Sequence, residues 1–142
     1  MLILLGFIVG LGATTVIDCI SLLGARSAHW TQTAIRAHKV TKPLIISGAI
    51  LKTMGEVHLY LLIDYPLFHL EVWLNSILLI NACLLVFWAS PYLLRKEKQN
   101  QDLEILPVSF LRIVIPSFIV SFVVWWTSFA LFALTLIYLI QK

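Results

Sequence analysis

Long apolar stretches separated by shorter polar segments dominate the chain. Four of them are long enough to cross a bilayer, at about 2–23, 43–63, 72–92 and 113–140. A helix needs about 20 mostly apolar residues to span a hydrocarbon core of about 30 Å. Because a backbone in lipid must satisfy its own hydrogen bonds, each stretch is predicted to be helical. The pattern therefore predicts an all-α polytopic membrane protein, with four transmembrane helices in one bundle that forms a single domain over 1–142.

The composition agrees with a membrane environment and argues against several functional classes. Hydrophobic residues make up 61% of the chain and charged residues only 12%, about half the charged share of a typical soluble domain. The net charge of +3 does not indicate nucleic-acid binding, and no metal site is predicted. A phosphate-binding loop, a metalloprotease helix and a Ser-His-Asp arrangement are absent from the sequence. An enzymatic role is therefore disfavoured, although the sequence leaves it undecided.

Basic residues between the apolar stretches predict the orientation of the chain. The segment 24–42 carries four of them, Arg26, Arg36, Lys39 and Lys42, and 93–112 carries a second group. Positively charged loops stay on the cytoplasmic side, so 24–42 and 93–112 are predicted to be cytoplasmic and both termini to face outward. The membrane is predicted to be the inner (plasma) membrane of a bacterium. The four basic residues of the first loop are expected to contact lipid head groups.

Charged and amide side chains inside the apolar stretches are the candidate functional residues. Lys52 and Glu56 lie one helical turn apart in the second stretch, and Asp18 and Asn81 lie in the first and third. Charges in lipid are costly, so they usually face a protein interior or a water-filled cavity. Comparing depths at a rise of about 1.5 Å per residue predicts that Asp18, Lys52, Glu56 and Asn81 form one intramembrane polar site.

Two interpretations of this polar site stay open. It is either a site for binding or translocating protons, ions or a small solute, since intramembrane carboxylates commonly serve this purpose, or a salt bridge and hydrogen bond that only hold helices together. The second interpretation predicts a structural subunit of a larger membrane assembly. In both cases we expect membrane lipids as partners, and either a homo-oligomer or a subunit of a membrane complex.

Two other features of the apolar stretches have specific implications. Gly6, Gly10 and Thr14 precede Asp18 at steps of four, and small residues on one stripe let a second helix approach closely. His58 follows Glu56 by two positions and therefore projects from nearly the opposite face of the helix. His58 is a candidate ligand of heme b, which would make the chain a membrane redox subunit, but no other histidine is predicted at its depth.

A family resemblance is carried by three segments, GFIVGLGATTVIDCISLLG, then IRAHKVTKPLIISG, and then LLIN ahead of SPYLL. Over roughly the first two-thirds of the chain these segments resemble small bacterial four-helix membrane proteins of the copper-resistance D type and their uncharacterised relatives. The resemblance singles out Asp18, His38, Asn81 and Pro91. Some members bind heme b, so the resemblance implies heme as a cofactor. This chain departs from the heme-binding members because its first span contains no histidine.

A second resemblance rests on Arg36-Ala37-His38 in the first loop. An Arg-x-His motif, four spans and a similar length resemble the microsomal glutathione-transferase family. Here Val40 and Lys42 follow the motif, and the Asn and Glu that this family uses nearby are missing. The resemblance implies a glutathione-transferase-like enzyme as a further alternative.

Overall fold

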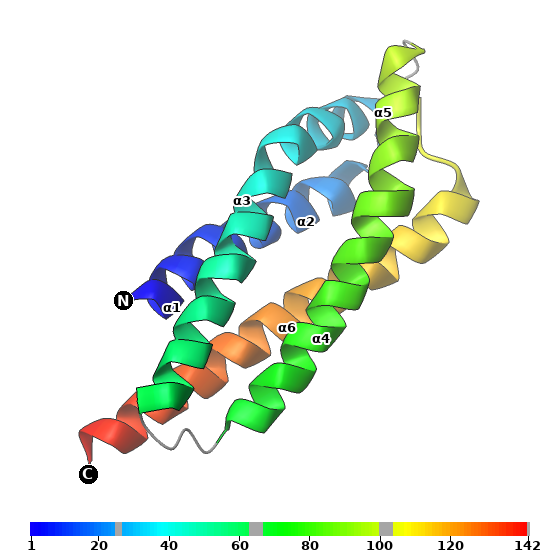
Figure 1. Cartoon of the computed structure of the whole chain (residues 1–142). Coiled ribbons are helices and arrows are strands. Elements are labelled where there is room, and N and C mark those ends of the chain that lie inside the picture. The colour runs from blue at the N-terminus through cyan, green and yellow to red at the C-terminus, as the bar shows by residue number, and fades with distance from the viewer. Residues whose placement is uncertain (25–26, 63–66, 100–103, 142) are drawn as a thin grey trace.

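The computed structural model describes residues 1–24, 27–62, 67–99 and 104–141, and nearly all of them are helical. Four continuous helices are long and apolar enough to cross a membrane, which confirms this part of the sequence prediction (Figure 1). These four helices are Leu2–Gly24, Ala28–Leu62, Phe68–Lys98 and Val108–Ile140.

Two of the long helices contain a wider π-helical turn and are therefore divided into three elements each. The first helix consists of α1 (Leu2–Gly6), η1 (Phe7–Leu11) and α2 (Gly12–Gly24). The second is a single element, α3 (Ala28–Leu62). The third consists of α4 (Phe68–Leu84), η2 (Leu85–Ala89) and α5 (Ser90–Lys98), and the fourth is α6 (Val108–Ile140).

The second helix is much longer than predicted. It begins at Ala28 rather than at Pro43, so most of the expected loop 24–42 is helical and Pro43 lies inside the helix. The residues between Ala28 and Pro43 include neither glycine nor proline, so the sequence holds nothing strong enough to end the helix there. An internal proline removes one backbone hydrogen bond, a loss that membrane helices tolerate. Arg26, which belongs to the same predicted loop, lies outside the described residues.

The expected loop 93–112 is shortened in the same way. The third helix runs on to Lys98, and α6 begins at Val108, directly after Pro107. The backbone amides of Phe110 and Leu111 donate to the Pro107 carbonyl, which closes the first turn of α6. The basic residues of this region therefore lie mostly on helix ends.

Glycine residues bring the first helix and α3 into backbone contact. A Cβ added at Gly48 would overlap the backbone of Gly10, and one added at Gly6 would lie 2.5 Å from the amide nitrogen of Lys52. Thr14, further along the same stripe, is buried. Helices that approach this closely gain van der Waals contacts along their whole shared length. The two helices consequently lie side by side and antiparallel (Figure 1).

The first helix also packs against α6 through aromatic side chains. Phe7 contacts Trp125, Phe129 and Phe132 at ring-centroid distances of 6.1, 5.3 and 5.7 Å. Trp125 is only 2% exposed and also contacts Gly10. A second apolar cluster, around Phe110 on α6, packs against η2 and α5. The Phe7 contacts join the first helix to α6 and so hold the two helix pairs together, whereas the Phe110 cluster joins α6 to the third helix.

Replacing Gly48 with alanine is expected to lower the free energy of unfolding by about 1–3 kcal/mol, because the new methyl group must displace the backbone of the first helix. The measurement is equilibrium unfolding of the purified protein in a mild detergent. Gly12→Ala is the matched control, since nothing lies within 4 Å of a Cβ at that position. If the two variants were equally stable, the close contact between these helices would be contradicted.

Candidate functional site

Three charged side chains meet in the interior of the molecule. Lys52 and Glu71 are 0% exposed and Glu56 is 3% exposed. Lys52 Nζ lies 2.5 Å from Glu56 Oε1 and 3.1 Å from Glu71 Oε2. Lys52 and Glu56 occupy successive turns of α3, while Glu71 lies in the first turn of α4. The ion pair between Lys52 and Glu71 therefore links two of the long helices.

Two neutral side chains complete this arrangement. Asn75, one turn after Glu71, accepts a hydrogen bond from Lys52 Nζ at 2.8 Å and donates one to Glu56 Oε2 at 2.8 Å. Ser128 Oγ on α6 donates to Glu71 Oε2. The five residues Lys52, Glu56, Glu71, Asn75 and Ser128 are called the Lys52 cluster below. The cluster is fixed by three helices, and the ring of Phe7 on the first helix lies 5.6 Å from Lys52 Nζ.

The formal charges of the Lys52 cluster do not cancel. It contains two carboxyl groups and one ammonium group, and all three are almost completely buried. Glu71 Oε1 is buried and has no hydrogen-bond partner within the described chain. A buried ionised carboxylate without compensation costs several kcal/mol, so such a group tends to become neutral or to bind a cation. The geometry therefore favours uptake of one positive charge at Glu71.

The structure brings together only two of the four residues that the sequence analysis placed in one site. Asn81 lies about 15 Å beyond Glu71 along α4 at about 1.5 Å per residue. Asn81 Nδ2 donates to the Ser117 carbonyl at 3.0 Å, and Ser117 Oγ donates to Asn81 Oδ1. Asp18 also lies elsewhere, because Gly6 is the residue of the first helix that contacts Lys52. The prediction failed because it measured the depth of Lys52 from Pro43, whereas α3 begins at Ala28.

The sequence analysis missed Glu71, Asn75 and Ser128. Glu71 lies one residue before the predicted third stretch, 72–92, whereas α4 already begins at Phe68. A pattern that could have revealed the site is the repeated four-residue spacing, since Glu71 and Asn75 on α4 match the spacing of Lys52 and Glu56 on α3. Polar residues at that spacing lie on one face of a helix.

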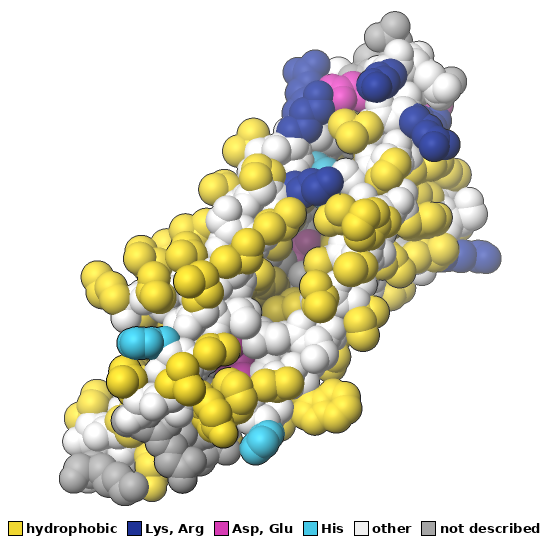
Figure 2. Space-filling model, in the orientation of Figure 1, with side chains coloured by type: hydrophobic (Ala, Val, Ile, Leu, Met, Phe, Trp, Pro, Cys, Tyr) yellow, Lys and Arg dark blue, Asp and Glu magenta, His cyan; other side chains and the backbone are white. Residues whose placement is uncertain are grey.

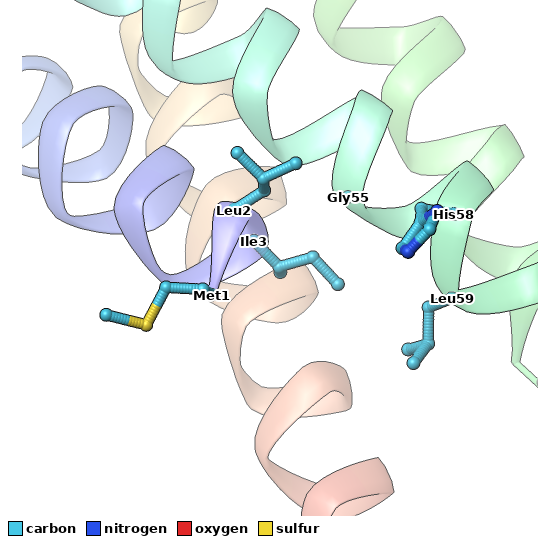
Figure 3. A pocket seen from close by; sticks show the side chains of 6 residues that line it. All are labelled: Met1, Leu2, Ile3, Gly55, His58 and Leu59. Atoms are coloured by element: carbon cyan, nitrogen blue, oxygen red, sulfur yellow. The ribbon is translucent and has the colours of Figure 1, made fainter. Parts of the chain in front are cut away.

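His58 lies apart from the Lys52 cluster. It is exposed and, with Met1, Leu2, Ile3, Gly55 and Leu59, lines a mostly apolar groove of about 310 Å³ between the start of the first helix and α3 (Figure 3). Met1 carries the other side chain of the groove that could ligate iron, but it points away from His58 (Figure 3). The groove residues thus do not fit a heme with two axial ligands. Within the described chain, no three His, Cys, Asp or Glu side chains gather closely enough to hold a metal ion.

The basic residues gather toward one end of the visible face, whereas hydrophobic side chains cover most of the remainder (Figure 2). Two of those predicted to contact lipid head groups also join α3 to α5: Lys39 Nζ lies 2.8 Å from Glu97 Oε1, and Lys42 Nζ lies 3.4 Å from Ser90 Oγ. Arg36 is exposed. This end of the molecule is therefore both positively charged and cross-linked between helices.

Replacing Lys52 with methionine is expected to lower the free energy of unfolding in detergent by about 3–5 kcal/mol, because two buried carboxyl groups lose their only ammonium partner. Lys39→Met is the matched control. It removes an ion pair whose lysine side chain is 50% exposed, so its effect should stay below about 1 kcal/mol. Equal losses in the two variants would show that the Lys52 cluster does not hold the helices together.

Comparisons with known proteins give no independent guide to this site. No family model, no curated protein and no solved structure matches the chain. The resemblance to the copper-resistance D type remains an expectation based on the sequence segments that carry it. The chemistry of the Lys52 cluster must therefore be inferred from its own residues.

Proposed function

We propose that the four long helices cross the membrane as one bundle and that the chain binds and translocates protons at the Lys52 cluster. The observation that carries the proposal is the buried Glu71 carboxyl group, one oxygen of which has no hydrogen-bond partner within the described chain. Its other oxygen accepts hydrogen bonds from Lys52 and Ser128. A single proton on the free oxygen would neutralise the cluster without moving any other group.

A proton fits this site better than a metal cation does. The Lys52 ammonium already occupies the centre, where oxygens of Glu56, Glu71 and Asn75 surround it. Metal cations such as Ca²⁺ and Mg²⁺ require six or more oxygen ligands, counting water. The one oxygen left over at Glu71 cannot supply such a shell, but it is sufficient to bind a proton.

Protonation of Glu71 would also change how the helices are held together. The ionised carboxylate attracts Lys52 across the α3–α4 contact, whereas the neutral acid keeps only a hydrogen bond. Lys52 would then be held chiefly by Glu56 and Asn75. Because Glu71 also contacts Ser128 on α6, its charge biases the relative positions of α3, α4 and α6. A site of this kind can couple proton binding to a conformational change.

The proposed orientation follows from the charged end of the molecule. We place the end that carries Arg36, Lys39 and Lys42 in the cytoplasm and both termini outside a bacterial plasma membrane. Arg36 then faces anionic lipid head groups. The helix Phe68–Lys98 is the least buried of the four long helices, so we place lipid acyl chains against it and, in an oligomer, a second copy of the chain.

Glu71→Gln is expected to reduce proton flux into liposomes to the level of empty liposomes, because an amide keeps the shape of the acid but does not exchange this proton. Flux is measured with a trapped pH-sensitive dye under an imposed pH difference. Glu97→Gln is the matched control, because Glu97 pairs with Lys39 outside the cluster, and its flux should equal that of the wild type.

Three outcomes of the flux experiment would count against the proposal. Wild-type flux in Glu71→Gln would show that Glu71 carries no proton. No flux in the wild type, together with a lower thermal stability of Glu71→Gln, would favour a purely structural subunit. Flux that appears only when a Na⁺ or K⁺ gradient replaces the pH difference would assign the site to that cation instead.

The proposed orientation predicts which positions react with a membrane-impermeant maleimide. Cys19 and Cys83 are exposed free thiols, so both are first replaced with alanine. In intact cells Gln141→Cys should then be labelled and Lys98→Cys should be protected until the cells are opened. The reverse pattern would invert the topology and overturn the assignment of the charged end to the cytoplasm.

A further inference from the structure

Asp18 is a buried carboxyl group outside the Lys52 cluster. It is 4% exposed, and its Oδ2 atom has no hydrogen-bond partner within the described chain. Thr14, one turn earlier on the same helix face, is 1% exposed, and its hydroxyl is likewise without a partner there. Buried polar atoms are nearly always hydrogen-bonded, and exceptions commonly mark a site for water or an ion. Two such atoms on one stripe therefore indicate a hydrated site.

The packing of the first helix against α6 adds further polar groups to this site. A Cβ added at Gly10 would lie 2.6 Å from the Trp125 ring. The two helices are antiparallel. Asp18 lies eight residues after Gly10, and Ser117 lies eight residues before Trp125, so Asp18 and Ser117 lie at the same level. Ser117 is buried, and so is Ser121, one turn nearer to Trp125. The carboxyl group of Asp18 thus lies at the level of serine hydroxyl groups rather than of a cation.

An aromatic layer separates Asp18 from the Lys52 cluster. Gly6 contacts the backbone of Lys52, and Asp18 lies about 18 Å further along the helix at about 1.5 Å per residue. Trp125, which packs against Gly10, lies between these two levels. Phe7, in edge-to-face contact with Trp125 at 6.1 Å, borders the Lys52 cluster. The two polar regions are therefore distinct and lie on opposite sides of an apolar barrier.

A small cavity lies on the charged side of Asp18. It has a volume of about 30 Å³ and is lined mostly by apolar residues, together with the polar Ser21, Thr31 and His38. Ser21 follows Asp18 by one helical turn, and the Nε2 atom of His38 is buried without a hydrogen-bond partner within the described chain. A cavity needs about 10–15 Å³ and at least two polar partners to hold one water molecule, and here Ser21 and His38 Nε2 are the two candidates for partners. A water molecule fits this cavity and would give His38 Nε2 a partner.

We infer that Asp18 is a second proton-binding site, which exchanges protons with the cytoplasmic side through His38 and water in this cavity. In the transfer, the N–H bond of protonated His38 breaks and a water molecule takes the proton. That water then gives up a proton to Asp18 Oδ2, where the new O–H bond forms. The inference extends the proposed proton function to a second site, and its test uses a signal from Asp18 itself.

The charged groups around this route are concentrated at its cytoplasmic end. On α3, Lys42 lies one turn after His38 and donates to Ser90 Oγ, and Lys39 is paired with Glu97 of α5. On α6, Arg112 is exposed, and the groups level with Asp18 are hydroxyls, of which that of Ser117 donates to Asn81 on α4. Burial of His38 and, less strongly, the charge of Lys42 disfavour its charged imidazole, so a proton on His38 is passed inward to the carboxyl group.

The experiment is infrared difference spectroscopy of the protein in liposomes, recorded during a pH change in H₂O and in D₂O. The C=O band of a protonated carboxyl group is assigned to Asp18 if Asp18→Asn removes it. The band is expected in the wild type and also in Glu71→Gln, which lacks the acid of the proposed function. In His38→Gln the band should persist, but exchange of the Asp18 proton for deuterium should slow roughly 100-fold. Loss of a positioned proton-transfer group typically has an effect of this size.

Each outcome distinguishes this inference from the proposed function. His29→Gln is the matched control, because His29 is an exposed histidine on the same helix, and it should exchange at the wild-type rate. A spectrum without an Asp18 band at any pH would overturn the second site, whatever the flux through Glu71. An Asp18 band whose exchange is unchanged in His38→Gln would overturn the route through His38. Loss of flux in Glu71→Gln with the Asp18 band intact would support both.

Discussion

The ion pair between Lys52 and Glu71 is the contact on which the rest of the arrangement depends. Lys52 lies on the helix that packs against the first helix through glycine, and Glu71 lies on the helix that packs against α6. Each partner is buried completely, so neither can turn to solvent if the other is removed. The free-energy cost of removing these charges from water is offset by their mutual attraction, and this requires both helix pairs to stay together. The same contact therefore links stability to the charge of one carboxyl group.

The polar groups are distributed along the molecule rather than collected in one place. The Lys52 cluster lies on one side of the aromatic contact between Phe7 and Trp125, and Asp18 lies on the other. For the proposed proton function, an apolar barrier between the two sites matters because continuous water would let protons pass freely. The bulky rings of Phe7 and Trp125 fill this space, and a phenyl ring offers no conventional hydrogen-bonding group that could continue the path.

The charged end has a structural role besides setting orientation. Lys39, which is half exposed, and Lys42 both connect α3 to α5. This is possible because α3 continues as a helix through the region predicted to be a loop, which carries these residues alongside α5. Long lysine side chains can reach between helices while their apolar stems stay on the helix surface. The contacts close the end of the molecule next to the cavity beside His38.

The sequence by itself determined the helical class, the four apolar segments and the burial of Lys52 and Glu56 inside the protein, because bilayer thickness and the cost of a charge in lipid act on each segment separately. It did not determine where the helices begin, so Glu71 lies just outside the predicted third stretch and the predicted depth of Lys52 matches that of Asp18. Only the tertiary structure decided that Glu71, Asn75 and Ser128 surround Lys52 while Asn81 pairs with Ser117. Such contacts depend on the axial register between helices, which is set where small residues such as Gly6 and Gly48 meet the backbone of the neighbouring helix. The register is a relation between two helices, so the sequence of a single segment does not reveal it.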